Sequence, residues 1–140
     1  MNLSTYPGTA VALTAWLFVL GTQSQTEDKN LEWQAFQTRN LLNSIQESGQ
    51  TYLPFLQIPT LRCGLYVLQA GAVDRQPVHD DDEVYYVVSG KAELRIDQEA
   101  IAVESGSVVF VKRGVSHRFQ NIEEELVVLV FFSSARPTED

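Results

Sequence analysis

Short apolar runs separated by turn residues fill the chain from residue 52 onward, and this pattern predicts an all-β domain. Residues 91–97 (KAELRID) alternate polar and apolar side chains, so this strand should have one buried and one solvent-facing side. Residues 126–132 (LVVLVFF) are apolar throughout, which indicates a strand covered on both faces. Many short strands of this kind form a sandwich or a barrel. The expected strands are residues 52–58, 61–69, 84–88, 91–97, 100–103, 107–111 and 126–132, with a tight turn at Ser89–Gly90.

An amphipathic helix is predicted ahead of the strands, over residues 39–48. Thr38 can cap its N-terminus, and Gly49 provides a stop. Leu41 and Ile45 fall on one face of this helix. Because so short a helix is marginal on its own, we expect it to pack against the outside of the β-structure.

The chain begins with an apolar segment, Val11–Gly21, followed by a polar stretch over residues 22–30. The apolar segment is shorter than the roughly 20 residues needed to cross a bilayer. An apolar run of this length followed by polar residues resembles a secretory signal peptide, which would place the mature protein in the periplasm or outside the cell, but Met1–Pro7 contains no Lys or Arg. The alternative is an N-terminal extension of a cytoplasmic protein. With either interpretation we expect residues 1–30 to lie outside a single domain at residues 31–135, and the mature form not to enter a membrane.

The charge balance limits the partners of this chain. It has 10 Lys and Arg against 18 Asp and Glu, a formal net charge of −8. Nucleic acids and anionic membranes are bound by basic surfaces, so neither is an expected partner. A single cysteine, Cys63, excludes an intramolecular disulfide, and its place within the expected strand 61–69 indicates a core side chain.

Residues with metal-binding chemistry gather at two places in the strand region. His79 is followed directly by acidic residues that end at Glu83, and the second histidine is His117. Side chains at even spacing share one face of a strand, so His79 and Glu83 should point the same way, followed by Tyr85. Asp81 has the same parity, and the alternative is that it sits in a bend. If the strand of His117 lies across the barrel, two imidazoles and one carboxylate converge. Such a set suits iron(II), manganese, nickel or zinc, although a lone histidine is more often an ordinary core or surface residue.

The spacing of His79, Glu83 and Gly90 gives these residues a wider context. Three residues separate the histidine from the glutamate, and six separate the glutamate from the glycine. With its flanking sequence, the stretch 71–90 (GAVDRQPVHDDDEVYYVVSG) resembles the first motif of the cupin superfamily. His79 stands at the place of the motif's second histidine, and Pro77 stands where the first histidine is usual.

A second stretch, residues 106–121 (GSVVFVKRGVSHRFQN), resembles the second cupin motif. Lys112 replaces a proline that is usual in the family. The two motifs come in the family's order, and the resemblance covers residues 61–132. The positions that match the second motif are Gly106, Gly114, His117 and Asn121.

The resemblance implies a cupin-type double-stranded β-helix, which is an all-β jelly-roll barrel, here with a short N-terminal helix. It also implies that His79, Glu83 and His117 hold one divalent metal ion. Proline at position 77 cannot ligate a metal, so the family's usual site of three histidines and one glutamate is reduced by one residue. A further ligand or pocket residue could come from Gln76, Asp81, Tyr85 or Phe119.

Two functions are consistent with this site. The first is a mononuclear metal enzyme of the oxygenase or isomerase type that acts on a small molecule, with Glu83 as a ligand and catalytic base. Two histidines and one carboxylate leave coordination positions open for a substrate. The alternative is a module that binds a small ligand without turnover, which the missing ligand at Pro77 favours. The expected edge strand 52–58 is the segment through which a homodimer could form.

Overall fold

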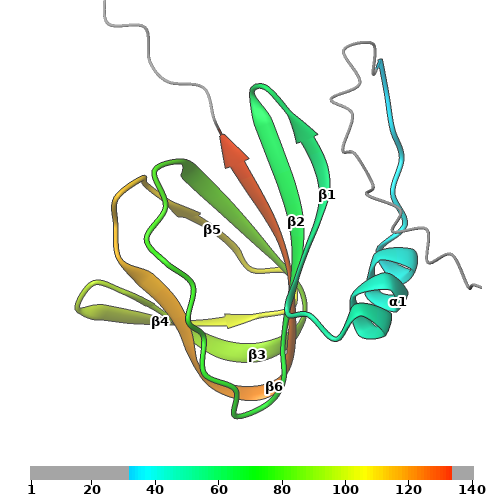
Figure 1. Ribbon diagram of the computed structural model, residues 1–140. Helices are drawn as coiled ribbons and strands as arrows, with labels where there is room; N and C mark the ends of the chain where they lie inside the picture. The colour runs from blue at the N-terminus through cyan, green and yellow to red at the C-terminus, as the bar shows by residue number, and fades with distance from the viewer. Residues whose placement is uncertain (1–31, 134–140) are drawn as a thin grey trace, which may run out of the picture.

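Within residues 32–133, which the computed structural model describes, one helix is followed by six antiparallel strands in a single curled sheet (Figure 1). The elements are α1 (Thr38–Ser48), β1 (Tyr52–Ile58), β2 (Leu61–Leu68), β3 (Asp82–Ile96), β4 (Glu99–Glu104), β5 (Val108–Val111) and β6 (His117–Ser133). The sheet order is β1-β2-β6-β3-β4, and β5 also pairs with β3. The apolar segment Val11–Gly21 and the predicted boundary at residue 30 lie outside the described residues.

The two long strands β3 and β6 bend the sheet into a barrel. The predicted turn at Ser89–Gly90 is wrong, because β3 continues through these residues and pairs with β6 on both sides of them. The register shifts repeatedly between Val87 and Glu93, and Gly90 takes a φ of +94° within this irregular stretch. Bulges increase the bend and twist of a strand. Here they let β3 pair with β5 and β6 before the irregular stretch and with β4 and β6 after it.

The apolar side chains form a core inside the barrel and a smaller cluster outside it. Inside, the largest fully buried side chains include Tyr85, Phe119 and Leu94. The alternating residues of β3 and β6 supply much of this core, as the period of a strand requires. Cys63 is also buried, with 3% of its surface exposed.

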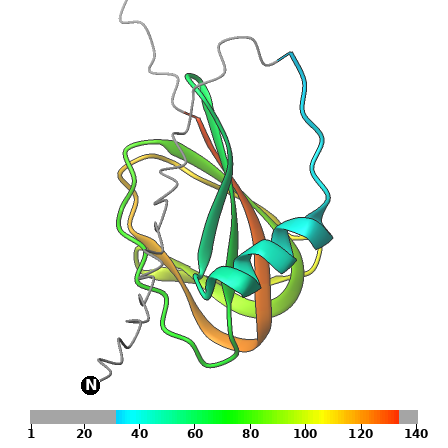
Figure 2. The same cartoon turned by 45° about the vertical axis from the view of Figure 1, so that its right-hand side comes forward.

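Helix α1 lies against the outer face of the sheet near β1 and β2 (Figure 2), as the sequence predicted. Its buried residue, Ile45, packs in a cluster with Leu65 of β2. Gln37 occupies the N-cap position without a side-chain cap, so the predicted capping role of Thr38 is wrong. Gly49 ends the helix in the left-handed conformation, with a φ of 66°. Among the described residues, no helix has the length and apolar composition needed to cross a bilayer.

A substitution at Gly90 tests whether the close approach of β3 to β6 in the irregular stretch is needed for stability. A Cβ at this position would collide with the backbone of Glu125 and Leu126, in addition to the strain of a positive φ. Gly106 has a similar φ of 91°, but a Cβ there would meet nothing within 4 Å. We expect Gly106→Ala to lower the free energy of unfolding by about 1–2 kcal/mol, and Gly90→Ala to lower it clearly more or to prevent folding. Urea denaturation measures both, and equal losses would contradict the close approach.

Candidate metal centre

Three side chains with metal-binding chemistry meet in the barrel. His79, Glu83 and His117 each offer one ligand atom, and these atoms all lie within 4.8 Å of one another. Glu83 and His117 are buried, with 2% and 6% of their surfaces exposed, and His79 is partly buried. Within residues 32–133, this is the one such group of three.

The curl of the long strands brings Glu83 and His117 together. Glu83 lies near the beginning of β3, whereas His117 opens β6 and pairs with Ile96 at the other end of β3. Because both strands curl around the barrel, Nε2 of His117 is nevertheless only 3.5 Å from Oε1 of Glu83. The two residues therefore face each other across the interior.

His79 reaches the centre from a loop. The prediction that His79 and Glu83 lie on one strand is wrong, because β3 begins only at Asp82. Asp81 lies in a bend, which was the alternative to a place on the strand. The backbone N–H of Gly114 donates a hydrogen bond of 2.9 Å to the carbonyl oxygen of His79. This bond ties the loop to the turn before β6, and thus to the segment that carries the second histidine.

The acidic run Asp80–Glu83 contributes only its last residue to the centre. The carboxylate of Asp81 forms an ion pair with Arg62. That of Asp82 accepts hydrogen bonds from the backbone N–H, Nε and Nη2 of Arg113, at 3.0, 3.2 and 3.1 Å. The Arg113 side chain and backbone hold the pKa of Asp82 below its usual value. Asp82 thereby ties the start of β3 to the turn before β6, whereas Asp81 faces Arg62.

The hydroxyl of Tyr85 lies between three acceptors. It is 2.7 Å from Oε2 of Glu83, 2.9 Å from Nε2 of His117 and 3.0 Å from Oε1 of Gln76. Nδ1 of His117 is 2.8 Å from the carbonyl oxygen of Val115, which can only accept, so Nδ1 carries a hydrogen. Nε2 of the neutral ring is then an acceptor, like the carboxylate and amide oxygens. One phenolic proton therefore faces three acceptors.

The pKa values of the centre reflect this excess of acceptors. Burial lowers the pKa of His117, but its bonds to Glu83 and Val115 and the charges of Glu83 and Asp74 raise it above its ordinary value overall. Burial and the adjacent Glu83 raise the pKa of Tyr85 far above its ordinary value, so the phenol keeps its proton. The centre consequently favours a proton on His117 or a cation on the same lone pairs.

Asp74, which the sequence analysis did not single out, orients Gln76. The aspartate is buried, and its Oδ1 accepts from the hydroxyl of Tyr66 at 2.6 Å and the N–H of Gln76 at 3.0 Å. Its Oδ2 accepts from Nε2 of Gln76 at 2.9 Å and the N–H of Phe119 at 2.8 Å. Gln76 therefore turns its Oε1 toward Tyr85. The only sequence signal was the two-residue spacing of Asp74 and Gln76, which suits an Asx turn.

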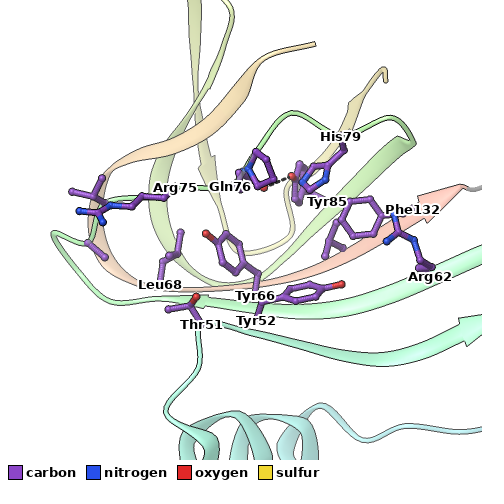
Figure 3. Close-up of a pocket in the computed structure, with 14 residues that line it drawn as sticks. Thr51, Tyr52, Arg62, Tyr66, Leu68, Arg75, Gln76, His79, Tyr85 and Phe132 are labelled. Carbon is purple, nitrogen blue, oxygen red and sulfur yellow. Dashed lines mark hydrogen bonds between the residues drawn. The ribbon is translucent and has the colours of Figure 1, made fainter. Parts of the chain in front are cut away.

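A cavity of about 550 Å³ adjoins the centre. Gln76, His79 and Tyr85 line it (Figure 3), and so does Pro77, which offers no ligand atom. Phe119, also expected in the pocket, lies behind it instead, in the core, with its ring centroid 5.3 Å from that of Tyr85. The full lining is Thr51, Tyr52, Arg62, Tyr66, Leu68, Ala72, Val73, Arg75, Gln76, Pro77, His79, Tyr85, Val130 and Phe132.

Comparison with known proteins identifies the family. Residues 64–133 match the family model of the cupin domain. This chain belongs to the cupin family. One relative is an uncharacterized protein of Streptomyces coelicolor, which is 50% identical over 82 residues that cover 59% of this chain and 78% of the relative.

Solved structures share the fold of this cupin. KdgF from Halomonas sp. is 23% identical with a TM-score of 0.55, and the match covers 61% of this chain and 79% of that one. An RmlC-like cupin from Shewanella frigidimarina is 22% identical with a TM-score of 0.53, covering 61% and 77%. A salicylate 1,2-dioxygenase from Pseudoaminobacter salicylatoxidans, in complex with gentisate, is 21% identical with a TM-score of 0.56, covering 69% and 31%. These similarities confirm the predicted all-β cupin barrel.

The raised pKa of His117 predicts how the stability of the metal-free protein depends on pH. A pKa that is higher in the folded than in the unfolded chain adds stability below the unfolded value, near 6.5. That stability is lost as the pH rises through the folded value. Urea denaturation in the presence of a chelator should therefore show a decline in stability as the pH rises above about 6.5, and this decline should be weaker in His117→Gln. Identical pH profiles for the two proteins would contradict this assignment.

Proposed function

We propose that this cupin holds one divalent metal ion through His79, Glu83 and His117 and acts on a small molecule in the adjoining cavity. The observation that carries the proposal is the hydroxyl of Tyr85, whose single proton faces three acceptors. A divalent cation would take lone pairs of Glu83 and His117 and leave the phenol free to donate to Gln76. Two imidazole nitrogens and a carboxylate oxygen within 4.8 Å suit iron(II), manganese, nickel or zinc.

In a mononuclear metal enzyme of the oxygenase or isomerase type, each residue around the centre would have a separate role. A bound metal ion supplies Lewis acidity and open coordination positions. Glu83 serves as a ligand and as a base for a proton of the small molecule. Tyr85, which stays protonated, can donate a hydrogen bond at the cavity wall. Gln76 holds the phenol in place through its own bonds to Asp74.

Metal content tests the first part of the proposal. The full-length chain, loaded with iron(II), manganese, nickel or zinc and then dialysed, should retain about one ion per chain. Glu83→Ala and His117→Ala should lose most of it, because each removes a ligand atom. Asp81→Asn is the matched control: it removes a neighbouring carboxylate that pairs with Arg62, so its metal content should stay unchanged. Elemental analysis that finds no metal in the parent chain, or equal losses in all three variants, would refute the site.

Binding without turnover is the second candidate function, and Pro77 favours it, because this residue lines the cavity without offering a ligand atom. Turnover distinguishes the two. We expect the iron(II)-loaded chain to consume oxygen with some member of a set of small phenols, thiols and keto acids, and His117→Ala to lose this activity while remaining folded. Ligand-dependent thermal stabilisation without oxygen consumption or isomerised product would instead establish the binding module.

A further inference from the structure

The charged side chains that line the cavity are basic, although the chain as a whole is acidic. The buried carboxylates of Asp74 and Glu83 lie behind this lining, bonded to Tyr66 and Tyr85. The chain carries 18 acidic residues against 10 basic ones. The residues that line the cavity nevertheless include two arginines, Arg62 and Arg75, and no aspartate or glutamate. Positive groups in a recess with apolar walls raise the local concentration of anions. The charge of the lining therefore points to an anionic ligand.

The two arginines differ in whether an acidic residue already pairs with their charge. Arg62 forms an ion pair with Asp81, and its Cζ lies 4.9 Å from the centroid of the Phe132 ring. Arg75 is exposed and makes no ion pair with any residue in the range 32–133. Its guanidinium is thus the uncompensated charge of the cavity, and a planar fork of this kind matches a carboxylate.

The wall between the two arginines is mainly aromatic and aliphatic. Figure 3 shows Arg75 and Arg62 at opposite ends of the cavity, with Tyr52, Tyr66 and Leu68 between them. Rings of this kind favour a flat aromatic body through offset or edge-to-face packing. The hydroxyl of Tyr66 is already bonded to Asp74, so this side chain offers mostly its ring.

We propose that the cavity binds a small aromatic carboxylate, with the carboxylate on Arg75 and the ring against Tyr66 and Leu68. The far side of the ring would then face Gln76 and His79, which line the same cavity. This inference rests on the proposed function only in one respect: it takes the metal centre as the place where the bound ligand would react. The binding itself needs Arg75 and the cavity wall, and can be measured without metal.

The test uses 2-naphthoate, a fluorescent aromatic carboxylate, with 2-naphthamide as its neutral analogue. Each is titrated into the full-length chain, both metal-loaded and chelator-treated. We expect naphthoate to bind at least tenfold more tightly than naphthamide, because a hydrogen bond between two charged groups is stronger than one to a neutral amide. Arg75→Gln should weaken naphthoate binding at least tenfold and leave naphthamide unchanged.

Arg39→Gln is the matched control, because it makes the same charge change on the exposed surface of α1, outside the barrel. It should leave naphthoate binding unchanged. Equal binding of naphthoate and naphthamide, or equal losses in Arg75→Gln and Arg39→Gln, would overturn the proposal. A loss in Arg62→Gln alone would also overturn it. If the parent chain takes up no metal but its naphthoate binding still depends on Arg75, the metal site fails and the carboxylate site stands.

Discussion

The hydroxyl of Tyr85 carries one proton in front of three acceptors, and much of the surrounding structure holds that arrangement in place. Phe119 packs against the ring of Tyr85 from the core. Asp74 fixes the amide of Gln76, and the carbonyl of Val115 fixes the tautomer of His117. Buried polar groups of this kind are costly unless they are paired. The excess of acceptors is therefore a property of the fold, and either a proton on His117 or a cation on the same lone pairs relieves it.

The curl of the sheet is the second requirement of the site. Glu83 and His117 lie toward opposite ends of the pairing between β3 and β6, and they meet only because both strands wrap around the interior. Gly90 lies within the irregular pairing that accompanies this bend. Asp82 and Arg113 then tie the beginning of β3 to the turn before β6. The bend at Gly90, the pairing of β3 with β6 and the bonds between Asp82 and Arg113 together bring Glu83 close to His117.

The sequence was informative where the signal was local. The predicted ends of β1 agree with the structure, and so does the predicted end of α1 before Gly49. Apolar runs and turn residues depend directly on the local backbone structure, so they could be interpreted without knowledge of distant contacts. The barrel followed from the two cupin-like motifs. Their candidate ligands His79, Glu83 and His117 do lie together, although their metal-binding role stays a prediction.

The features that could not be predicted depend on contacts between distant segments. Gly90 looked like a turn, because the pairing that carries β3 onward comes from β6. His79 was placed on a strand by parity, which says nothing of where a strand begins. The bond between Asp74 and the backbone N–H of Phe119 could not be predicted, because the two residues lie 45 positions apart in the chain. No periodic pattern reports a hydrogen bond of that kind.

The most direct test of the centre is an anomalous-scattering crystal structure of the full-length chain loaded with zinc or manganese. We expect one anomalous peak bonded to His79, Glu83 and His117, with the hydroxyl oxygen of Tyr85 within hydrogen-bonding distance of Oε1 of Gln76. A peak on the carboxylates of Asp80–Asp82, with none between the two histidines, would contradict this account.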